Sequence, residues 1–478
     1  MSATNPQPGG DRPKTTPFKI LILSDLAPPG HVGARARSPV DKDSLEALVG
    51  RLCGSVRLRI GQNDVTLTLD SMASFRPAEV AAQAGGGARP AGGSAIDQVL
   101  AATPTGNPAA HAVLTHPDFV RLERAWRSLK FLVDRVDFRQ DIKVEVIPAD
   151  KASAALALRT LVRDPEFELP SDEPVSLVVA DYELDTSAAD LAVLAELGDL
   201  GMDLYAPVLS AVCEGFFSVQ ALSELARRHN VKSVFDDAAH DEWRGFRKGE
   251  PSRWVALSCN RFLLREEQAG APALYGNPAY VLATVCARRF AELRWCSQIS
   301  GPQTGAVGGL PVRMIEAGGR EVNVPVEAVL PEQVASDLGD AGLVVLQSRP
   351  NSDTVYVLRA PTTHENERYS VAAETEQSRL RISLEHQLFV GRLAQQLELL
   401  ARAVAGVDAT GIESLFEQAI AGMLKLAGRA AEDAALAVKV VPTQGRDDRY
   451  DVIVNVRPGK LLLAGRVTGI LLTFRVAR

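Results

Sequence analysis

The chain has 478 residues, of which 46% are hydrophobic and 23% are charged. This composition is ordinary for a globular protein with a substantial core, and it excludes a wholly disordered chain. At ~150 residues per domain, the length predicts about three compact units or one large α/β body. The net charge of −7 gives no electrostatic reason to expect nucleic acid, and no stretch approaches the ~18 apolar residues of a membrane span. We therefore expect a cytoplasmic protein with no nucleic-acid partner and no membrane insertion.

The cysteine and histidine patterns argue against metal chemistry. The five cysteines show no CxxC spacing, and most of them lie in apolar surroundings. The seven histidines are dispersed and include no HExxH pair. We expect buried free thiols, with no disulfide, metal site or cofactor, at Cys53, Cys213, Cys259, Cys286 and Cys296.

The first part of the chain predicts a small folded segment followed by a linker. Residues 1–17 are polar and rich in Pro and Gly, which is typical of a flexible tail. Residues 18–23 form an apolar run that predicts a buried strand, and alternating apolar residues over 56–69 predict a hairpin. Ala and Gly then dominate the composition, so we place a small unit at 18–77 and an Ala/Gly-rich linker at 78–110.

A strong helix signal opens the next unit. Pro117 suits the first helical position, and Phe119, Leu122, Trp126 and Leu129 recur at spacings of 3, 4 and 3. This pattern predicts an amphipathic helix with a buried apolar stripe. Further along, we expect strands at 142–147, 175–180 and 253–257 and helices at 188–197, 218–228 and 277–296.

The last third of the chain has the same mixed character. We predict strands at 343–346, 355–358, 437–441, 450–456 and 461–476, and helices at 393–404 and 412–423. Strands and helices are interspersed throughout, and no tandem repeat is visible. We therefore predict an α/β fold of the mixed α+β type, with larger units at 111–330 and 331–478.

Two features could carry phosphate or metal chemistry. Residues 301–309 form a glycine-rich loop, but neither a P-loop lysine nor a helix start follows it, so a structural loop is favoured over a nucleotide site. Asp25 and Asp181 each follow an apolar run, and carboxylates at the ends of parallel strands can hold magnesium. The commoner interpretation is that both aspartates terminate strands. We predict no catalytic residue and keep magnesium-dependent phosphoryl transfer as a minor alternative.

Several long motifs occur in one order along the chain. Residues 116–129 read HPDFVRLERAWRSL, and residues 177–183 read LVVADYE. WRGFR, SRWVAL and RFLLR follow between residues 243 and 265, and GNPAY, WC and GLP follow between residues 276 and 311. This series resembles the large subunit of the type VI secretion contractile sheath, over about residues 111–478.

The beginning of the chain has a resemblance of its own. FKILILSD at 18–25, together with SFRP at 74–77, resembles the small subunit of the same sheath. The two resemblances imply a natural fusion of a shortened small subunit, at about 18–77, with the large subunit. They also imply the sheath-protomer fold, in which central mixed sheets are flanked by helices.

The resemblance implies a structural protein rather than an enzyme. Such a subunit would polymerise helically with itself around an inner tube protein and contract to propel the tube. Baseplate components are implied as further partners, as is an AAA+ unfoldase, although the segment before Thr115, where large subunits carry the helix read by the unfoldase, is rich in Gly and Ala here. The alternative is a non-polymerising baseplate or accessory protein of the same apparatus.

Exposed backbone edges would join such subunits, because an open edge can add a strand from another chain. We predict inter-protomer or intra-fusion strand pairing at Phe18, Ile20, Ile22, Val452, Val454, Val456, Leu463 and Leu471. The family motifs place a second set in the core of the large-subunit part, namely Phe119, Trp126, Leu129, Asp181, Trp243, Arg253, Asn277 and Trp295. The helices around 393–426 are predicted to contact the inner tube.

Overall fold

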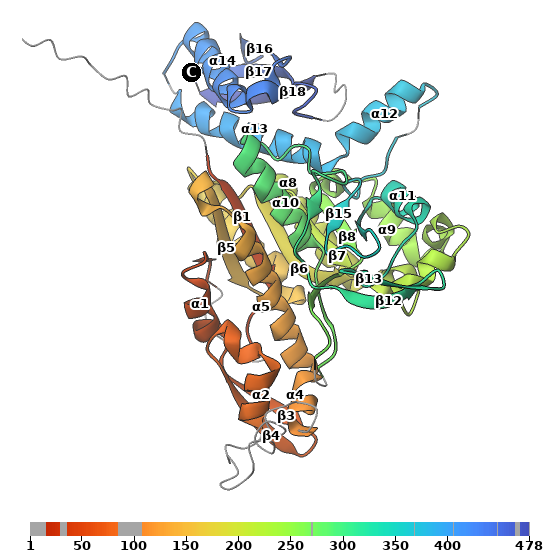
Figure 1. Cartoon of the computed structure of the whole chain (residues 1–478). Helices are drawn as coiled ribbons and strands as arrows, with labels where there is room; N and C mark the ends of the chain where they lie inside the picture. The colour runs from red at the N-terminus through yellow and green to blue at the C-terminus, as the bar shows by residue number, and fades with distance from the viewer. Residues whose placement is uncertain are drawn as a thin grey trace, which may run out of the picture.

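The computed structural model describes residues 16–28, 36–84, 108–268, 271–367, 369–404, 406–446, 448–463 and 469–477. Most of the predicted tail and linker lies outside these residues. Within them the chain forms a mixed α/β fold, as predicted, with a central body and a smaller body at each end (Figure 1).

The central body is built on a nine-stranded sheet. In spatial order its strands are β11 (Ala306–Val307), β15 (Val355–Val357), β14 (Leu343–Ser348), β8 (Val255–Cys259), β7 (Val208–Val212), β6 (Leu177–Leu184), β1 (Phe18–Ser24), β5 (Ile142–Pro148) and β2 (Ser38–Pro39). β1 runs parallel to both of its neighbours, so that Ile20 pairs with Val144 on one side and with Leu177 on the other. Every residue of β1 is buried, as expected for a parallel strand covered on both faces.

Helices cover both faces of this sheet, and successive residues of β1 point to opposite faces. Ile20 and Ile22 join the core beneath α5 (Pro117–Arg135) and α10 (Ala279–Leu293). Leu21 and Leu23 join the core beneath α6 (Ala154–Leu158), α8 (Ala188–Asp203) and α11 (Glu332–Asp340). The predicted amphipathic helix is α5, and its apolar stripe is buried as expected.

The body at the end of the molecule away from the C-terminal body packs around the first turns of α5 (Figure 1). It contains α1 (Leu45–Leu52), β3 (Gly54–Ile60), β4 (Asn63–Leu69), α2 (Pro77–Ala84) and α4 (Pro108–Leu114). β3 and β4 form the predicted hairpin, and their inward residues belong to the same core as α5.

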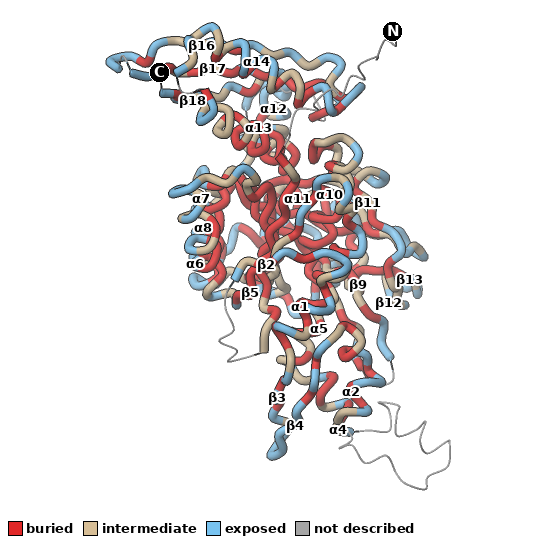
Figure 2. Tube along the Cα trace, turned by 90° about the vertical axis from the view of Figure 1, so that its left-hand side faces the viewer, coloured by how far each residue is buried: buried red, intermediate tan, exposed pale blue. Residues whose placement is uncertain are grey.

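The C-terminal body has a core of its own. It contains α13 (Leu384–Ala403), α14 (Ala409–Lys425) and an antiparallel sheet in the order β16 (Ala435–Pro442), β17 (Arg449–Arg457), β18 (Ile470–Ala477). Alternate residues of β17 pack against the two helices, and Figure 2 shows this buried layer above the core of the central body. α12 (Ala372–Arg381) projects beside α13 (Figure 1).

The remaining elements lie around the central body. They are α7 (Asp164–Glu168), α9 (Asp241–Phe246), the pair β9 (Phe262–Arg265) and β10 (Leu274–Gly276), and the hairpin of β12 (Arg313–Ala317) and β13 (Arg320–Val324).

Three local predictions were wrong. The helix expected at 218–228 is a 3-10 segment, Leu222–Arg227, and Ser218 before it has a φ of 52°, which a right-handed helix excludes. The strand expected from 461 begins only at Ile470, because Leu462 and Leu463 are buried in a turn. Asp181 does not terminate a strand, because β6 continues to Leu184.

Candidate assembly surfaces

The central sheet offers little free edge. Its outermost strands, β11 and β2, have two residues each, and β2 ends on Pro39, which has no backbone N–H to donate. Short edge strands and edge prolines are devices that prevent unwanted pairing between copies. Behind β2, however, the seven-residue strand β5 is paired on its outer side only at Glu145 and Val146 among the described residues, so part of its edge has no strand partner.

The C-terminal sheet has the longer free edges. Its outer strands, β16 and β18, have eight residues each and pair only with β17 among the described residues. One face of the sheet packs on α13 and α14, whereas Leu471, on the opposite face of β18, is 67% exposed. These two strands are the strongest candidates for pairing with another chain.

Most of the predicted strand-pairing residues lie elsewhere. Phe18, Ile20 and Ile22 lie on β1, which pairs with β5 along its length and with β6 from Ile20 to Leu23, so pairing with another protomer through this strand is wrong. Val452, Val454 and Val456 lie on β17, the central strand of its sheet, and are buried. Leu463 is buried in a turn, and only Leu471 lies on a free edge. Alternation in the sequence identified the strands but not their order in the sheets.

The motif residues are mainly core residues of the central body. Phe119, Trp126, Leu129 and Trp243 are fully buried. The indole Nε1 of Trp126 donates to the Leu26 carbonyl at 3.1 Å, which ties α5 to the segment after β1.

Two other motif residues fasten helices to the sheet or to each other. Asn277 accepts from the Ala279 amide at 2.9 Å at the start of α10 and donates to the Tyr182 carbonyl of β6 at 3.1 Å. Trp295 follows α10, donates to the Met423 carbonyl of α14 at 3.2 Å and stacks on Phe389 of α13 with ring centroids 4.5 Å apart. Arg253 is half-buried and pairs with Glu250 at 2.8 Å.

Asp181 is a buried carboxyl held by two hydroxyl groups. Ser24 Oγ donates to it at 2.8 Å and the Tyr280 hydroxyl at 3.1 Å. Desolvation raises its pKa to about 7 despite the nearby positive charge of Arg124. Asp25 instead forms an ion pair with Arg121 at 2.7 Å.

These two aspartates do not form a metal site with other ligands. Among the described residues, no group of three or more His, Cys, Asp or Glu side chains is placed to hold a metal ion. The glycine-rich segment 301–309 is a close-packed turn, since a Cβ on Gly305 would lie 2.8 Å from the carbonyl oxygens of Ile299 and Val357.

Ion pairs occupy the edge of the sheet where many α/β proteins bind ligands. Arg261, just after β8, lies 2.8 Å from Glu327 and also pairs with Glu183 and Glu214. Arg124 of α5 pairs with Glu183 as well. Desolvation raises the pKa of Glu327, and Arg261 opposes that rise. Sequence reasoning missed this network, although Arg261 and Glu214 closely follow the apolar strands β8 and β7, and Arg124, Glu183 and Arg261 lie within the motifs.

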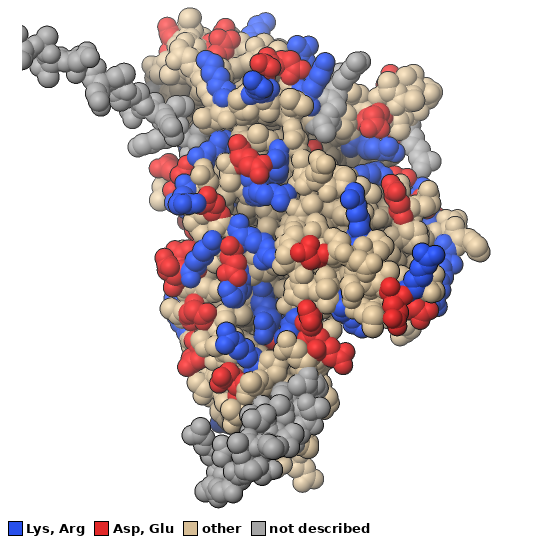
Figure 3. All heavy atoms as spheres, viewed as in Figure 1, with Lys and Arg blue, Asp and Glu red and all other residues tan. Residues whose placement is uncertain are grey.

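The side of the surface shown in Figure 3 has mixed charge over the described residues. On the described part of that face, Lys and Arg alternate with Asp and Glu without a patch of one sign. No helix among the described ranges combines the length and apolarity needed to cross a bilayer.

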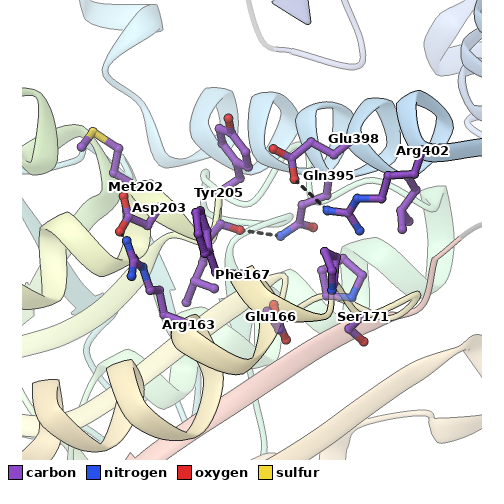
Figure 4. Close-up of a pocket in the computed structure, with 14 residues that line it drawn as sticks. Arg163, Glu166, Phe167, Ser171, Met202, Asp203, Tyr205, Gln395, Glu398 and Arg402 are labelled. Carbon is purple, nitrogen blue, oxygen red and sulfur yellow. Dashed lines mark hydrogen bonds and ion pairs between the residues drawn. The ribbon is translucent and has the colours of Figure 1, made fainter. Parts of the chain in front are cut away.

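Two clefts border α13. One, of about 520 Å³, lies between α7, the end of α8 and the second half of α13, and is lined by Phe167, Tyr205 and Leu399, among others (Figure 4). The other, of about 1250 Å³, lies between α12, the start of α13 and the segment around His364. Charged side chains of both signs line each cleft.

Comparisons with known proteins define the class of this protein. The type VI secretion system sheath protein TssC1 of Pseudomonas aeruginosa is 25% identical over 329 residues, a match that covers 62% of this chain and 66% of the relative. The chain thus spans just under two thirds of that relative. Together with a family match over residues 105–364, this relative places the chain in the class of the tail sheath proteins.

Solved structures are similar at low identity. A chain of the anti-feeding prophage baseplate is 12% identical with a TM-score of 0.44, covering 99% of both chains. A chain of the contracted helical sheath of the same prophage is 11% identical with a TM-score of 0.41, covering 100% of this chain and 95% of that one. These structures are too dissimilar to define the class of the protein, which follows from the sequence comparisons.

Residues 105–364 match the VipB family, described as EvpB/VC_A0108, tail sheath N-terminal domain. The match covers more than half of the 478 residues, and the chain belongs to this family. The resemblance to a type VI secretion sheath protein is thereby confirmed.

Proposed function

We propose that this protein is a structural subunit of a contractile, type VI secretion-like sheath in the bacterial cytoplasm. It polymerises helically with itself around an inner tube and contracts to propel that tube. Beyond family membership, one observation supports the proposal, namely the two free eight-residue edges of the C-terminal sheet.

Strand addition at these edges would join copies of the chain through backbone hydrogen bonds. Each added backbone hydrogen bond contributes about 1 kcal/mol net, and a strand of this length can form several. Where head-to-tail contacts of this kind do not close into a ring, their repetition gives a helical filament.

We further propose that the chain unites both sheath subunits. The small-subunit-like segment at 18–77 contributes β1, which lies between β5 and β6 of the part at 111–330, and the linker at 78–110 joins the two. Without β1 these two strands would lose a common neighbour. A covalent fusion would guarantee the one-to-one ratio of the two parts.

A pair of matched substitutions tests polymerisation. Leu471→Lys places a charge on the free edge strand β18, whereas Leu461→Lys places it at a similarly exposed position in a turn. Surface changes of this kind usually alter the free energy of unfolding by less than about 0.5 kcal/mol, so both variants should fold. We expect sedimentation to show polymer for the wild type and Leu461→Lys, and only small species for Leu471→Lys.

The outcome separates the main alternatives. A wild-type protein that stays monomeric at all concentrations in light-scattering measurements would favour a non-polymerising baseplate or accessory protein. Binding of an inner tube protein, of baseplate components and of an AAA+ unfoldase remains part of the proposal and is testable by co-purification with each candidate.

A further inference from the structure

α13 connects the central body to the C-terminal body and contributes to both cores. Leu384 and Leu388, in its first two turns, belong to the core of the central body. Leu393 and Leu397, further along, belong to the core of the C-terminal body. The helix therefore passes from one core into the other along its length.

Beyond its first turns, α13 meets the central body through buried polar side chains. Gln395 donates through Nε2 to the Val175 carbonyl at 2.6 Å. It also donates to the Leu204 carbonyl at 2.9 Å, a bond drawn as a dashed line in Figure 4. Arg392 donates to the Thr16 carbonyl at 3.0 Å, two residues before β1. Both side chains are more than nine-tenths buried.

The arginine has an unusual environment for a buried cation. Arg392 forms no ion pair with any described carboxylate, and its Nε has no hydrogen-bond partner in the described part of the chain. Its guanidinium lies 4.7 Å from the ring centre of Phe290 and 6.0 Å from that of Trp295. Phe290 in turn stacks on Phe18 at 5.1 Å, so a column of rings links β1 to the C-terminal body through Arg392. Cation–π contact compensates part of the desolvation cost.

The packing around these contacts is tight, but it covers only a short stretch of α13. A Cβ on Gly391 would lie 2.2 Å from the Tyr205 carbonyl oxygen, which shows how closely α13 approaches the central body here. The two clefts described above, of about 520 Å³ and about 1250 Å³, border α13 toward its two ends. Close contact is thus concentrated in the middle of the helix.

We propose that Arg392 and Gln395 form a latch that sets the orientation of the C-terminal body on the central body. Apolar packing at Leu384 and Leu388 is non-directional and tolerates rotation, whereas hydrogen bonds to fixed carbonyl groups select one orientation. Buried polar groups can specify one arrangement without adding net stability. Release of the latch lets α13 swing about its first turns into the space of the clefts. A role of this swing in contraction rests on the proposed function, but the latch itself does not.

Spin-label distance measurements test the latch on unassembled protein. Labels are placed at Ala192→Cys on α8 and at Lys439→Cys on β16, both exposed positions, in a Leu471→Lys background in which we expect no polymer. Cys213, the one described cysteine that is not fully buried, is replaced by Ser so that only the new thiols react.

The double variant Arg392→Met/Gln395→Leu removes the polar contacts while keeping apolar volume. We expect a single narrow distance distribution before this change and a broad or displaced one after it, with one cooperative unfolding transition in both proteins. Arg402→Met is the matched control, because Arg402 lies on the same helix, is exposed and pairs only with Glu398 among described side chains. It should leave the distribution narrow.

An unchanged distribution in a folded double variant would overturn the latch. If the double variant fails to fold, Arg392→Lys replaces it, since lysine keeps the charge but loses the planar, stacked geometry, and the same two outcomes decide. Failure of the wild-type chain to form tubes would instead contradict the proposed function, and it would leave the distance comparison intact.

Discussion

The buried Asp181 carboxyl makes the stability of this protein depend on pH in a direction that can be calculated. Its pKa in the fold is about 7, compared with 3.8 for an unperturbed aspartate, because desolvation disfavours the charged form. Between these two pH values the folded state binds more protons at this site than the unfolded state does. The free energy of unfolding must therefore fall as pH rises through this window.

The magnitude follows from the size of the shift. At 1.36 kcal/mol per pKa unit, a shift of this size corresponds to about 4 kcal/mol, of which more than half falls between pH 5 and pH 7.5. Asp181→Asn removes the ionisable group but keeps an oxygen that can accept from Ser24 and Tyr280. Other groups that titrate in this range, such as His386, whose pKa burial lowers to about 4, are common to both proteins and cancel in the difference.

The assay is urea unfolding followed by circular dichroism at several pH values for both proteins. We expect the stability of the wild type relative to Asp181→Asn to fall steadily from pH 5 to about pH 7 and then to level off. Parallel stability curves for the two proteins would refute this reasoning, because they would mean that Asp181 ionises equally in both states.

Three further substitutions probe the core and the ion-pair network. Trp126→Phe leaves the Leu26 carbonyl without its indole donor and should lower the free energy of unfolding by about 1–3 kcal/mol in urea titrations; a loss within error would contradict the tie between α5 and β1. Arg261→Met leaves three carboxylates without their shared cation and should lower the free energy of unfolding by about 3–5 kcal/mol, more at pH 8 than at pH 5. The control Arg139→Met changes a side chain that is 89% exposed and should lower that free energy little. Equal losses in the two variants would argue against the network. Gly391→Ala forces a clash with the central body and should lower the melting temperature. Gly245→Ala has open space around the new Cβ, so it should leave the free energy of unfolding unchanged or raise it by up to about 1 kcal/mol. A more stable Gly391→Ala than Gly245→Ala would show that α13 does not pack as described.

The sequence predicted elements better than it predicted their arrangement. Helical spacing from Phe119 onwards identified α5, and the apolar run at 18–23 identified β1, because burial on one or both faces leaves a periodic signal. Nothing in the local pattern indicates that β1 lies between β5 and β6, since that order depends on pairing over more than 100 residues. Of the predicted strand-pairing residues, all but Leu463 lie on strands, but only Leu471 lies on a strand with a free edge.

The polar contacts were the least accessible to sequence reasoning. Arg392 and Gln395 lie in a helix whose apolar periodicity was recognised, yet their burial depends on which segments α13 crosses. Arg261 and Glu183 lie within the family motifs, so the motif series contained the network without indicating its geometry. Charged residues that directly follow apolar strands are the signal that could have indicated it.

The most direct test of this account is a helical reconstruction by electron cryomicroscopy of the purified chain. We expect hollow tubes in which a strand from a neighbouring copy extends the C-terminal sheet at β16 or β18. Tubes whose copies meet only through other surfaces, or particles that contain a single chain at every concentration, would contradict it.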